Sequence, residues 1–274
     1  MSLKKRLFYG YNGAFNKGLT FKKNIMNPKS LVLAVETSSR IGSVAIAVGK
    51  KILAETFFSA PIKHSAEIFP AISDILGRFS RNPDNIEQIH ISAGPGSFTG
   101  LRIAVTLAKT MHLANTAKII AVDTLDVIAA NANDYLKEKK TSTDSPERIA
   151  TILDAKRGQF FIAVYRRNTS STQRMDSNGT WKKIFPDSLM TAPQFLDQFT
   201  RDEKPIWLLG DGLLYYKDIF KAHTVRFMDE KYWSPRASNV FLLGCEKALA
   251  GKFEDPLTLT PNYLLRPDIK IKTR

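Results

Sequence analysis

The sequence predicts an α/β protein with two related halves, each containing a mixed β-sheet and flanking helices. Three observations support this fold class. Short apolar runs typical of buried strands alternate with segments of helical periodicity. The same element order, three strands, a helix, a strand and a helix, occurs twice, although no residue-level repeat is visible. A charged, Ser- and Thr-rich stretch separates the halves, so we expect a first domain at 30–136 and a second at 137–274.

The first half begins with three strands that form a meander. Its predicted elements are strands at 31–35, 42–48 and 52–58, a helix from about 64 to 79, a strand at 89–93, a helix from about 101, a strand at 118–122 and a helix at 125–136. Gly49 suits the positive φ of a tight turn between the second and third strands. The helix from Leu101 is apolar around most of its circumference, so both its own sheet and a second helix or a partner must cover it.

The second half repeats this pattern with longer loops. We expect strands at 149–153, 160–165, 181–185 and 206–209, helices at 193–199, after Gly210-Asp211-Gly212 and at 237–250, and a polar loop at 166–180. Gly251 is placed to end the last helix, because glycine readily takes the left-handed conformation that follows a helix C-terminus.

Composition limits the functional classes. The single cysteine, Cys245, excludes an intramolecular disulfide and a cysteine-based metal site, and it fits a reducing, cytoplasmic location. No window is apolar enough for a membrane-spanning helix. The net charge of +14 favours a polyanionic partner such as nucleic acid, although charge alone identifies no binding site.

Residues 1–29 form a basic N-terminal extension that we expect to be disordered. Residues 1–25 hold six basic side chains and no acidic one, which leaves +8 for the rest of the chain. An organelle transit peptide fits this composition. The favoured interpretation is a disordered or non-native segment ahead of a start at Met26, because the segment has no helical or strand periodicity.

The most specific motif is the loop at 94–100, which reads Gly-Pro-Gly-Ser-Phe-Thr-Gly between a predicted strand and a predicted helix. Free N–H groups at a helix start can bind an anion. The spacing matches no dinucleotide fingerprint, Walker loop or nucleophile elbow. Two interpretations stay open: a tight turn capped by Ser97 or Thr99, or a phosphate loop. The candidate phosphate-binding residues are Gly94, Gly96, Ser97 and Gly100.

A second candidate lies at the end of the first strand, which reads Glu36-Thr37-Ser38. A carboxylate and two hydroxyls could hold a metal–phosphate group, and they are equally typical of a polar turn. The four histidines, His64, His90, His112 and His223, include no pair at a metal-binding spacing, so we expect no metal site.

Several segments together resemble the TsaB (YeaZ) family. The matching stretches are 33–38, 43–46, 64–67, 94–104, 108–109, 122–125, 154–159 and 261–266. The string Gly-Pro-Gly-Ser-Phe-Thr-Gly-Leu-Arg is highly specific to this family. The resemblance spans about 31–267 and is dense to about 126. It implies the ASKHA fold, the actin and sugar-kinase type with two related domains, in agreement with the duplicated element order.

The resemblance also implies a function. Family members are non-catalytic subunits required for threonylcarbamoyl transfer to adenosine 37 of tRNA, and they bind and activate a TsaD-like catalytic partner. Further implied partners are a TsaE-like ATPase, tRNA through the complex, and a second copy when the chain is alone. No cofactor is required by the subunit itself, with ATP or ADP at the interface of the complex. TsaD binds a metal through two histidines whose places are Thr124 and Ile128 here, so no catalytic residue is expected.

Some features depart from the family pattern. Glu36 stands where Asp is more common, the N-terminal extension and the loop at 166–180 are longer, and the second domain matches weakly. The alternative function is an ATP-dependent small-molecule kinase or hydrolase of the same fold, which needs a carboxylate-bound metal in the cleft. A metalloprotease is disfavoured because no His-Glu-x-x-His motif occurs. A nucleic-acid-binding module is supported by charge alone.

We expect the two helices of the first domain to form the partner interface. Two adjacent apolar helices can meet two partner helices as a four-helix bundle. The residues predicted for this interface are His64, Ile68, Ile72, Leu101, Ala104, Val105, Ala108 and Met111.

Overall fold

The computed structural model describes residues 29–58, 64–139, 145–168 and 181–264. The predicted extension at 1–29, except its last residue, lies outside the described residues, as does most of the polar loop at 166–180. In the described part of the chain, no helix is long and apolar enough to cross a membrane.

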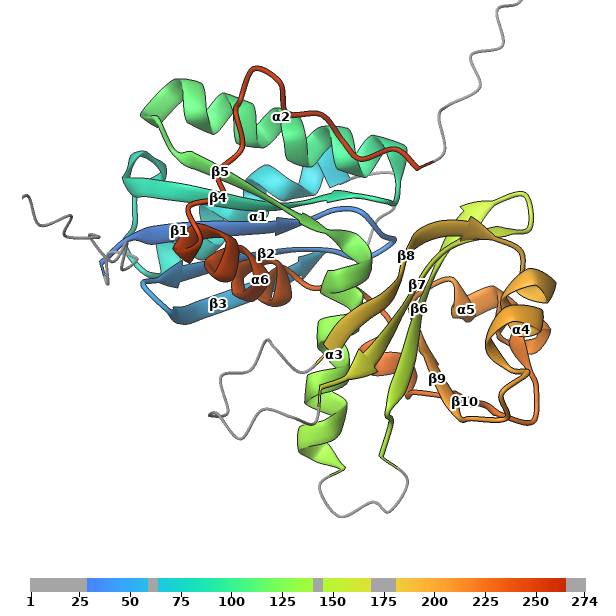
Figure 1. Cartoon of the computed structure of the whole chain (residues 1–274). Coiled ribbons are helices and arrows are strands. Elements are labelled where there is room, and N and C mark those ends of the chain that lie inside the picture. The colour runs from blue at the N-terminus through green and yellow to red at the C-terminus, as the bar shows by residue number, and fades with distance from the viewer. Residues whose placement is uncertain (1–28, 59–63, 140–144, 169–180, 265–274) are drawn as a thin grey trace, which may run out of the picture.

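The first sheet contains five strands in the order β3-β2-β1-β4-β5 (Figure 1). They are β1 (Leu31–Glu36), β2 (Gly42–Val48), β3 (Lys51–Phe58), β4 (Ile86–Gly94) and β5 (Lys118–Asp123). The central strand β1 pairs antiparallel with β2 and parallel with β4. The sheet is therefore mixed, as predicted, and the β2–β3 turn has the positive φ expected at Gly49.

The second sheet has the order β10-β9-β6-β7-β8. Its strands are β6 (Arg148–Lys156), β7 (Gln159–Arg167), β8 (Trp181–Met190), β9 (Ile206–Leu209) and β10 (Val225–Phe227). Equating β6 to β10 with β1 to β5 in turn gives the same strand order in both sheets. The predicted fold class, with two related mixed sheets, is confirmed.

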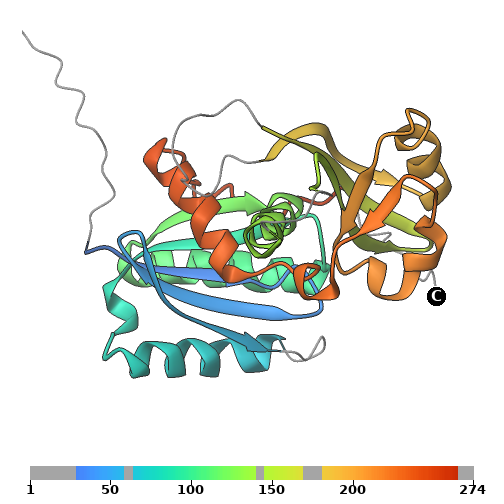
Figure 2. The same cartoon turned by 90° about the horizontal axis from the view of Figure 1, so that it is seen from below.

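Helices cover both faces of the first sheet. On one face lie α1 (His64–Arg78) and α2 (Phe98–Asn115), and on the other lie α3 (Thr124–Glu138) and α6 (Ala237–Leu249). Figure 2 shows α1 and α6 on opposite sides of this sheet. Alternate residues of β1 point to opposite faces of the sheet. Leu33 packs in the apolar core between the sheet and the helices α1 and α2, and Val32 packs in the core between the sheet and the helices α3 and α6.

Two helices connect the halves. The helix α3 contacts β4 and β5 of the first sheet and β6 to β8 of the second. The prediction assigned α6 to the second domain, but its contacts are with β1, β2, β4 and β5. Its apolar face, which includes Val240 and Phe241, joins the core of the first sheet. The chain therefore returns to the first sheet after completing the second.

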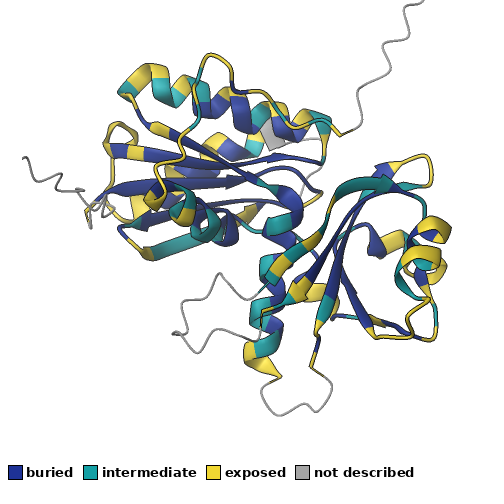
Figure 3. Cartoon of the chain, viewed as in Figure 1, coloured by how far each residue is buried: buried dark blue, intermediate teal, exposed yellow. Residues whose placement is uncertain are grey.

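The remaining helices pack on the second sheet. They are α4 (Ala192–Phe199), α5 (Leu213–Tyr216) and a 3₁₀ turn at Lys217–Phe220. Aromatic rings fill the space beneath them, with Phe160 and Phe220 in edge contact at 4.9 Å between ring centroids. Figure 3 shows the central strands of both sheets as buried and the outer surfaces of the helices as exposed.

Several boundaries differ from the prediction. The helix α2 begins at Phe98 rather than about Leu101, because Ser97 caps it by accepting from the Gly100 N–H at 3.3 Å. The short strand β10 and the 3₁₀ turns at Pro83–Asn85 and Glu230–Tyr232 were not predicted, since three residues are too few to show a periodicity.

Candidate functional site

The carboxylate of Glu36, at the end of β1, is fully buried and satisfied by its own surroundings. Its Oε1 accepts from the Ser38 N–H at 2.6 Å and from the Ser38 hydroxyl, and its Oε2 accepts from the hydroxyl of Ser92 on β4. Burial raises the pKa of Glu36, while the hydrogen bonds from Ser38 and Ser92 act in the opposite direction. This group therefore ties β1 to β4.

Replacing this carboxyl should change how stability depends on pH. Because the folded pKa of Glu36 is raised, the contribution of this group to the free energy of unfolding falls as pH rises above about 4.5 toward the folded pKa. Glu36→Gln removes that fall while keeping an acceptor for the Ser38 N–H. Urea unfolding at several pH values should show the variant gaining stability relative to wild type as pH rises. Glu87→Gln, at an exposed position of β4, is the control and should follow wild type. A difference in unfolding free energy between Glu36→Gln and wild type that does not change with pH would contradict the raised pKa of Glu36.

The glycine loop is packed against the end of β1. The Ser97 N–H donates to the Ser38 carbonyl at 2.7 Å, and the Leu101 N–H donates to the Ser97 carbonyl at 2.9 Å. The Thr37 hydroxyl donates to the Gly100 carbonyl at 2.7 Å. A Cβ on Gly100 would lie 1.8 Å from the Thr37 carbonyl oxygen. The N–H groups of Ser97, Gly100 and Leu101 thus have protein acceptors, as the capped-turn interpretation requires.

The second half contains a counterpart that the sequence prediction missed. Asp154 lies two residues before the end of β6, and its carboxylate accepts from the Lys156 N–H at 2.7 Å, as Glu36 accepts from the N–H of Ser38, two residues on. Gly210, directly after β9, has a φ of 126°, the same value as Gly94 at the end of β4. Aligning the two halves would have revealed both features, because each half has a carboxylate near the end of its first strand and a Gly-x-Gly sequence at the end of its fourth.

Asp211, between the glycines of the second loop, joins the halves. Its carboxylate accepts from the Ser39 hydroxyl after β1, and burial raises its pKa. It also lines a cavity of about 620 Å³ between the domains. The other lining residues are Arg40, Ile41, Phe57, Leu214, Glu230, Lys231, Trp233, Ser234 and Arg236.

The beginning of α3 holds no imidazole. The resemblance places the two metal-binding histidines of TsaD at positions 124 and 128 of this chain. Thr124 and Ile128 are both fully buried. Nearby, the Lys183 ammonium of β8 lies 2.8 Å from Asp126 and 2.6 Å from Asp187, which links α3 to the second sheet. Among the residues that the structure describes, no group of three or more His, Cys, Asp or Glu side chains could hold a metal ion.

An apolar groove of about 400 Å³ lies on the outer surface of α1 and α2. Phe69 of α1 leaves 61% of its surface exposed there. The residues that line the groove are Phe69, Phe98, Thr99, Arg102, Ile103, Thr106, Leu107 and Thr110. An exposed aromatic ring beside an apolar groove is typical of a protein–protein contact.

The predicted interface residues do not line this groove. Most of them are buried in the core beneath α1 and α2: Ile68, Ile72, Leu101, Ala104, Val105 and Ala108. Met111 is half-buried against the same core, and the side chain of His64 lies outside the described residues. The prediction took the most apolar stripe of each helix as the outward face, but that stripe covers the sheet.

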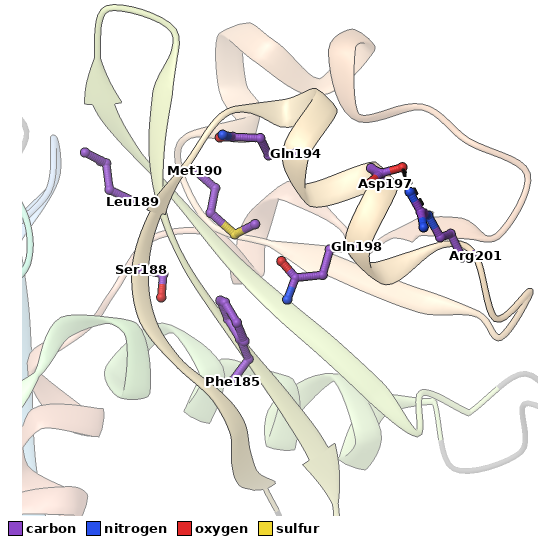
Figure 4. A pocket seen from close by; sticks show the side chains of 8 residues that line it. All are labelled: Phe185, Ser188, Leu189, Met190, Gln194, Asp197, Gln198 and Arg201. Carbon is purple, nitrogen blue, oxygen red and sulfur yellow. Dashed lines mark hydrogen bonds and ion pairs between the residues drawn. The ribbon is translucent and has the colours of Figure 1, made fainter.

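A further cavity lies elsewhere, between β8 and α4, with a volume of about 650 Å³ (Figure 4). Phe185 and Met190 project from β8, and Gln194 and Gln198 from α4. At the helix side, Asp197 and Arg201 form an ion pair with each other. No predicted site residue lies in it, and its charges are mutually neutralised.

Comparisons with known proteins bear on these sites. Residues 58–273 match the family described as TsaD, tRNA N6-adenosine threonylcarbamoyltransferase. The tRNA threonylcarbamoyladenosine biosynthesis protein TsaB of Bacillus subtilis (strain 168) is 28% identical over 244 residues, covering 88% of this chain and 96% of that protein. TsaB of Buchnera aphidicola subsp. Acyrthosiphon pisum (strain APS) is 30% identical over 184 residues, covering 66% and 75%.

Among solved structures, YeaZ from Pseudomonas aeruginosa superposes with a TM-score of 0.69 at 21% identity, covering 86% of this chain and all of that one. This likeness confirms the fold class that the sequence resemblance implied.

Proposed function

The chain belongs to the TsaB (YeaZ) family of tRNA threonylcarbamoyladenosine biosynthesis proteins, and from this premise we propose that it acts as a non-catalytic subunit that binds and activates a TsaD-like catalytic partner. The observation that carries the proposal is the apolar groove on α1 and α2. A partner that buries Phe69 there would remove a large apolar side chain from water, which is the main favourable term in association.

The absence of catalysis by this subunit is supported by two features. The places of the relative's metal ligands are Thr124 and Ile128, and an isoleucine side chain has no atom that can bind a metal. The carboxylate of Glu36 is enclosed and already accepts three hydrogen bonds, so a substrate would have to displace Ser38 or Ser92 to reach it. The kinase or hydrolase alternative gains no support from this arrangement.

We place the protein in a cytoplasmic assembly with the TsaD-like subunit, a TsaE-like ATPase and tRNA held through the complex. A second copy would cover the same groove when the chain is alone, since a self-complementary helix pair can form a symmetric dimer. ATP or ADP would bind at the interface of the complex, because the N–H groups of Ser97, Gly100 and Leu101 are already paired within the chain.

Phe69→Asp should break the complex while leaving the fold intact. Loss of a central aromatic contact typically costs about 2 kcal/mol or more, so binding of a TsaD-like protein should weaken at least about 30-fold. The control is Phe57→Asp, because Phe57 is similarly exposed, at 52%, but lines the interdomain cavity. Isothermal titration calorimetry measures binding, and circular dichroism checks the fold.

The same proteins test activation. Threonylcarbamoyl transfer to tRNA should require both subunits and should fall with Phe69→Asp but not with Phe57→Asp. The chain alone, given ATP with magnesium or zinc, should not turn over. Turnover of about 1 per second or faster by the isolated chain would indicate an enzyme instead.

A further inference from the structure

The C-terminal segment returns to the groove. After α6, the Glu254 N–H donates to the Ile119 carbonyl at the free edge of β5, at 2.9 Å. Leu259 is buried in the core beneath α1 and α2. The Asn262 N–H then donates to the Ala93 carbonyl at 2.7 Å, just ahead of the glycine loop. Figure 1 shows this segment, coloured red, running over α2. We call residues 254–263 the C-terminal strap.

The strap ends on two residues of the groove. The Tyr263 ring packs on the Phe98 ring, with 5.1 Å between centroids. The Arg102 Nε donates to the Tyr263 hydroxyl at 3.1 Å, and the guanidinium carbon lies 3.7 Å from the centroid of Phe98. Both Phe98 and Arg102 line the groove. Tyr263 therefore restricts the conformations of two groove residues that belong to α2.

The remaining hydrogen-bonding capacity of Arg102 indicates the chemistry of a partner. Its Nε is occupied by Tyr263, and among the described residues none accepts from its two terminal amino groups. The side chain is exposed, yet its orientation is fixed by a ring below and a hydroxyl beside it. A guanidinium held in this way presents paired N–H donors that suit a carboxylate.

We propose that the C-terminal strap, through Tyr263, completes the docking groove by positioning Phe98 and Arg102, and that the groove takes a partner helix with apolar side chains and one carboxylate opposite Arg102. This inference rests on the proposed function, because the occupant is the TsaD-like subunit. A helix fits because the groove runs between the side chains of two helices, where a further helix can pack its ridge. Tyr263 is a positioning residue for the interface.

Three variants test the proposal by calorimetric titration with the TsaD-like protein. Tyr263→Phe removes the hydroxyl that accepts from Arg102 and should weaken binding about fivefold, the typical effect of one hydrogen bond. Tyr263→Ala also removes the ring that supports Phe98 and should weaken binding about 50-fold. Arg102→Ala should weaken binding and flatten its salt dependence, because the charge pair is lost. The control is Tyr215→Ala, because Tyr215 is an exposed tyrosine that also lies beside an arginine, with its ring 5.1 Å from the Arg40 guanidinium and away from the groove.

A double variant separates positioning from a merely structural role. If Tyr263 acts through Arg102, then Tyr263→Phe should have no added effect on binding once Arg102 is alanine. If the folded variants Tyr263→Phe and Tyr263→Ala bind the TsaD-like protein with wild-type affinity, the role of the strap is overturned and the proposed function is unaffected. Failure of the wild-type chain to bind would overturn both.

Discussion

Ala108→Arg will unfold the first domain rather than release a partner. Ala108 is fully buried in the core between α2 and the first sheet. An arginine there would place an unpaired charge among apolar side chains, at a cost of about 3–5 kcal/mol. That is a large part of the stability of a typical domain, which is about 5–15 kcal/mol. Circular dichroism should show lost helical signal or a strongly lowered melting temperature.

Thr106→Arg is the matched variant, because it places the same side chain two residues earlier on α2. Thr106 is exposed and lines the groove, so the variant should fold with a melting temperature near that of wild type. Its bulk and charge should nevertheless block the partner in size-exclusion chromatography of the mixed proteins. A folded Ala108→Arg protein that still assembles would refute the assignment of the two faces of α2.

Gly100→Ala will destabilise the protein although the change adds a single methyl group. The new Cβ would lie 1.8 Å from the Thr37 carbonyl oxygen, and both partners are backbone, so neither can move as a side chain would. Relief requires shifting the start of α2 away from the end of β1, and we expect a loss of about 3 kcal/mol. For a chain of this size the melting temperature should fall by about 6–12 °C.

Gly77→Ala provides the control. Gly77 lies near the end of α1, and a Cβ there meets no atom within 4 Å. Alanine loses less backbone freedom than glycine on folding, so this variant should be more stable than wild type by about 0.5–1 kcal/mol. Differential scanning calorimetry should show a lower melting temperature than wild type for Gly100→Ala and a higher one for Gly77→Ala. A Gly100→Ala protein that melts with wild type would show that the loop is not packed against β1.

The elements that could be predicted from the sequence are those with a strong local signal. The strand β2 was found with its observed ends, and the cap at Ser97 was anticipated, because a run of apolar residues and a capping hydroxyl are both local features. The family resemblance rested on several short segments, of which the equally local glycine loop was the most specific. The two-sheet architecture followed from the order of such elements.

Features that depend on distant parts of the chain could not be predicted in this way. The helix α6 has an apolar stripe that is visible in the sequence, but nothing in that stripe tells which sheet it covers. The outward face of α2 was misjudged for a related reason. Ala104 and Ile103 are both apolar, and only the packed structure shows that the first faces the sheet and the second the groove. Asp211 was overlooked because its partner, Ser39, lies far away in sequence.

The return of the chain to the first sheet has a consequence for synthesis on the ribosome. One face of that sheet is covered only in part, by α3, until α6 has emerged, and Tyr263 can reach the groove only after α6 has been made. Domains usually fold from the N-terminus as they are made. Here the first domain is translated first, but its packing is completed only after the second sheet has been made. A chain truncated before Tyr263 would therefore lack the complete docking surface. Such incomplete chains would bind the partner poorly, because the residues that complete the surface are among the last of the described chain to be made.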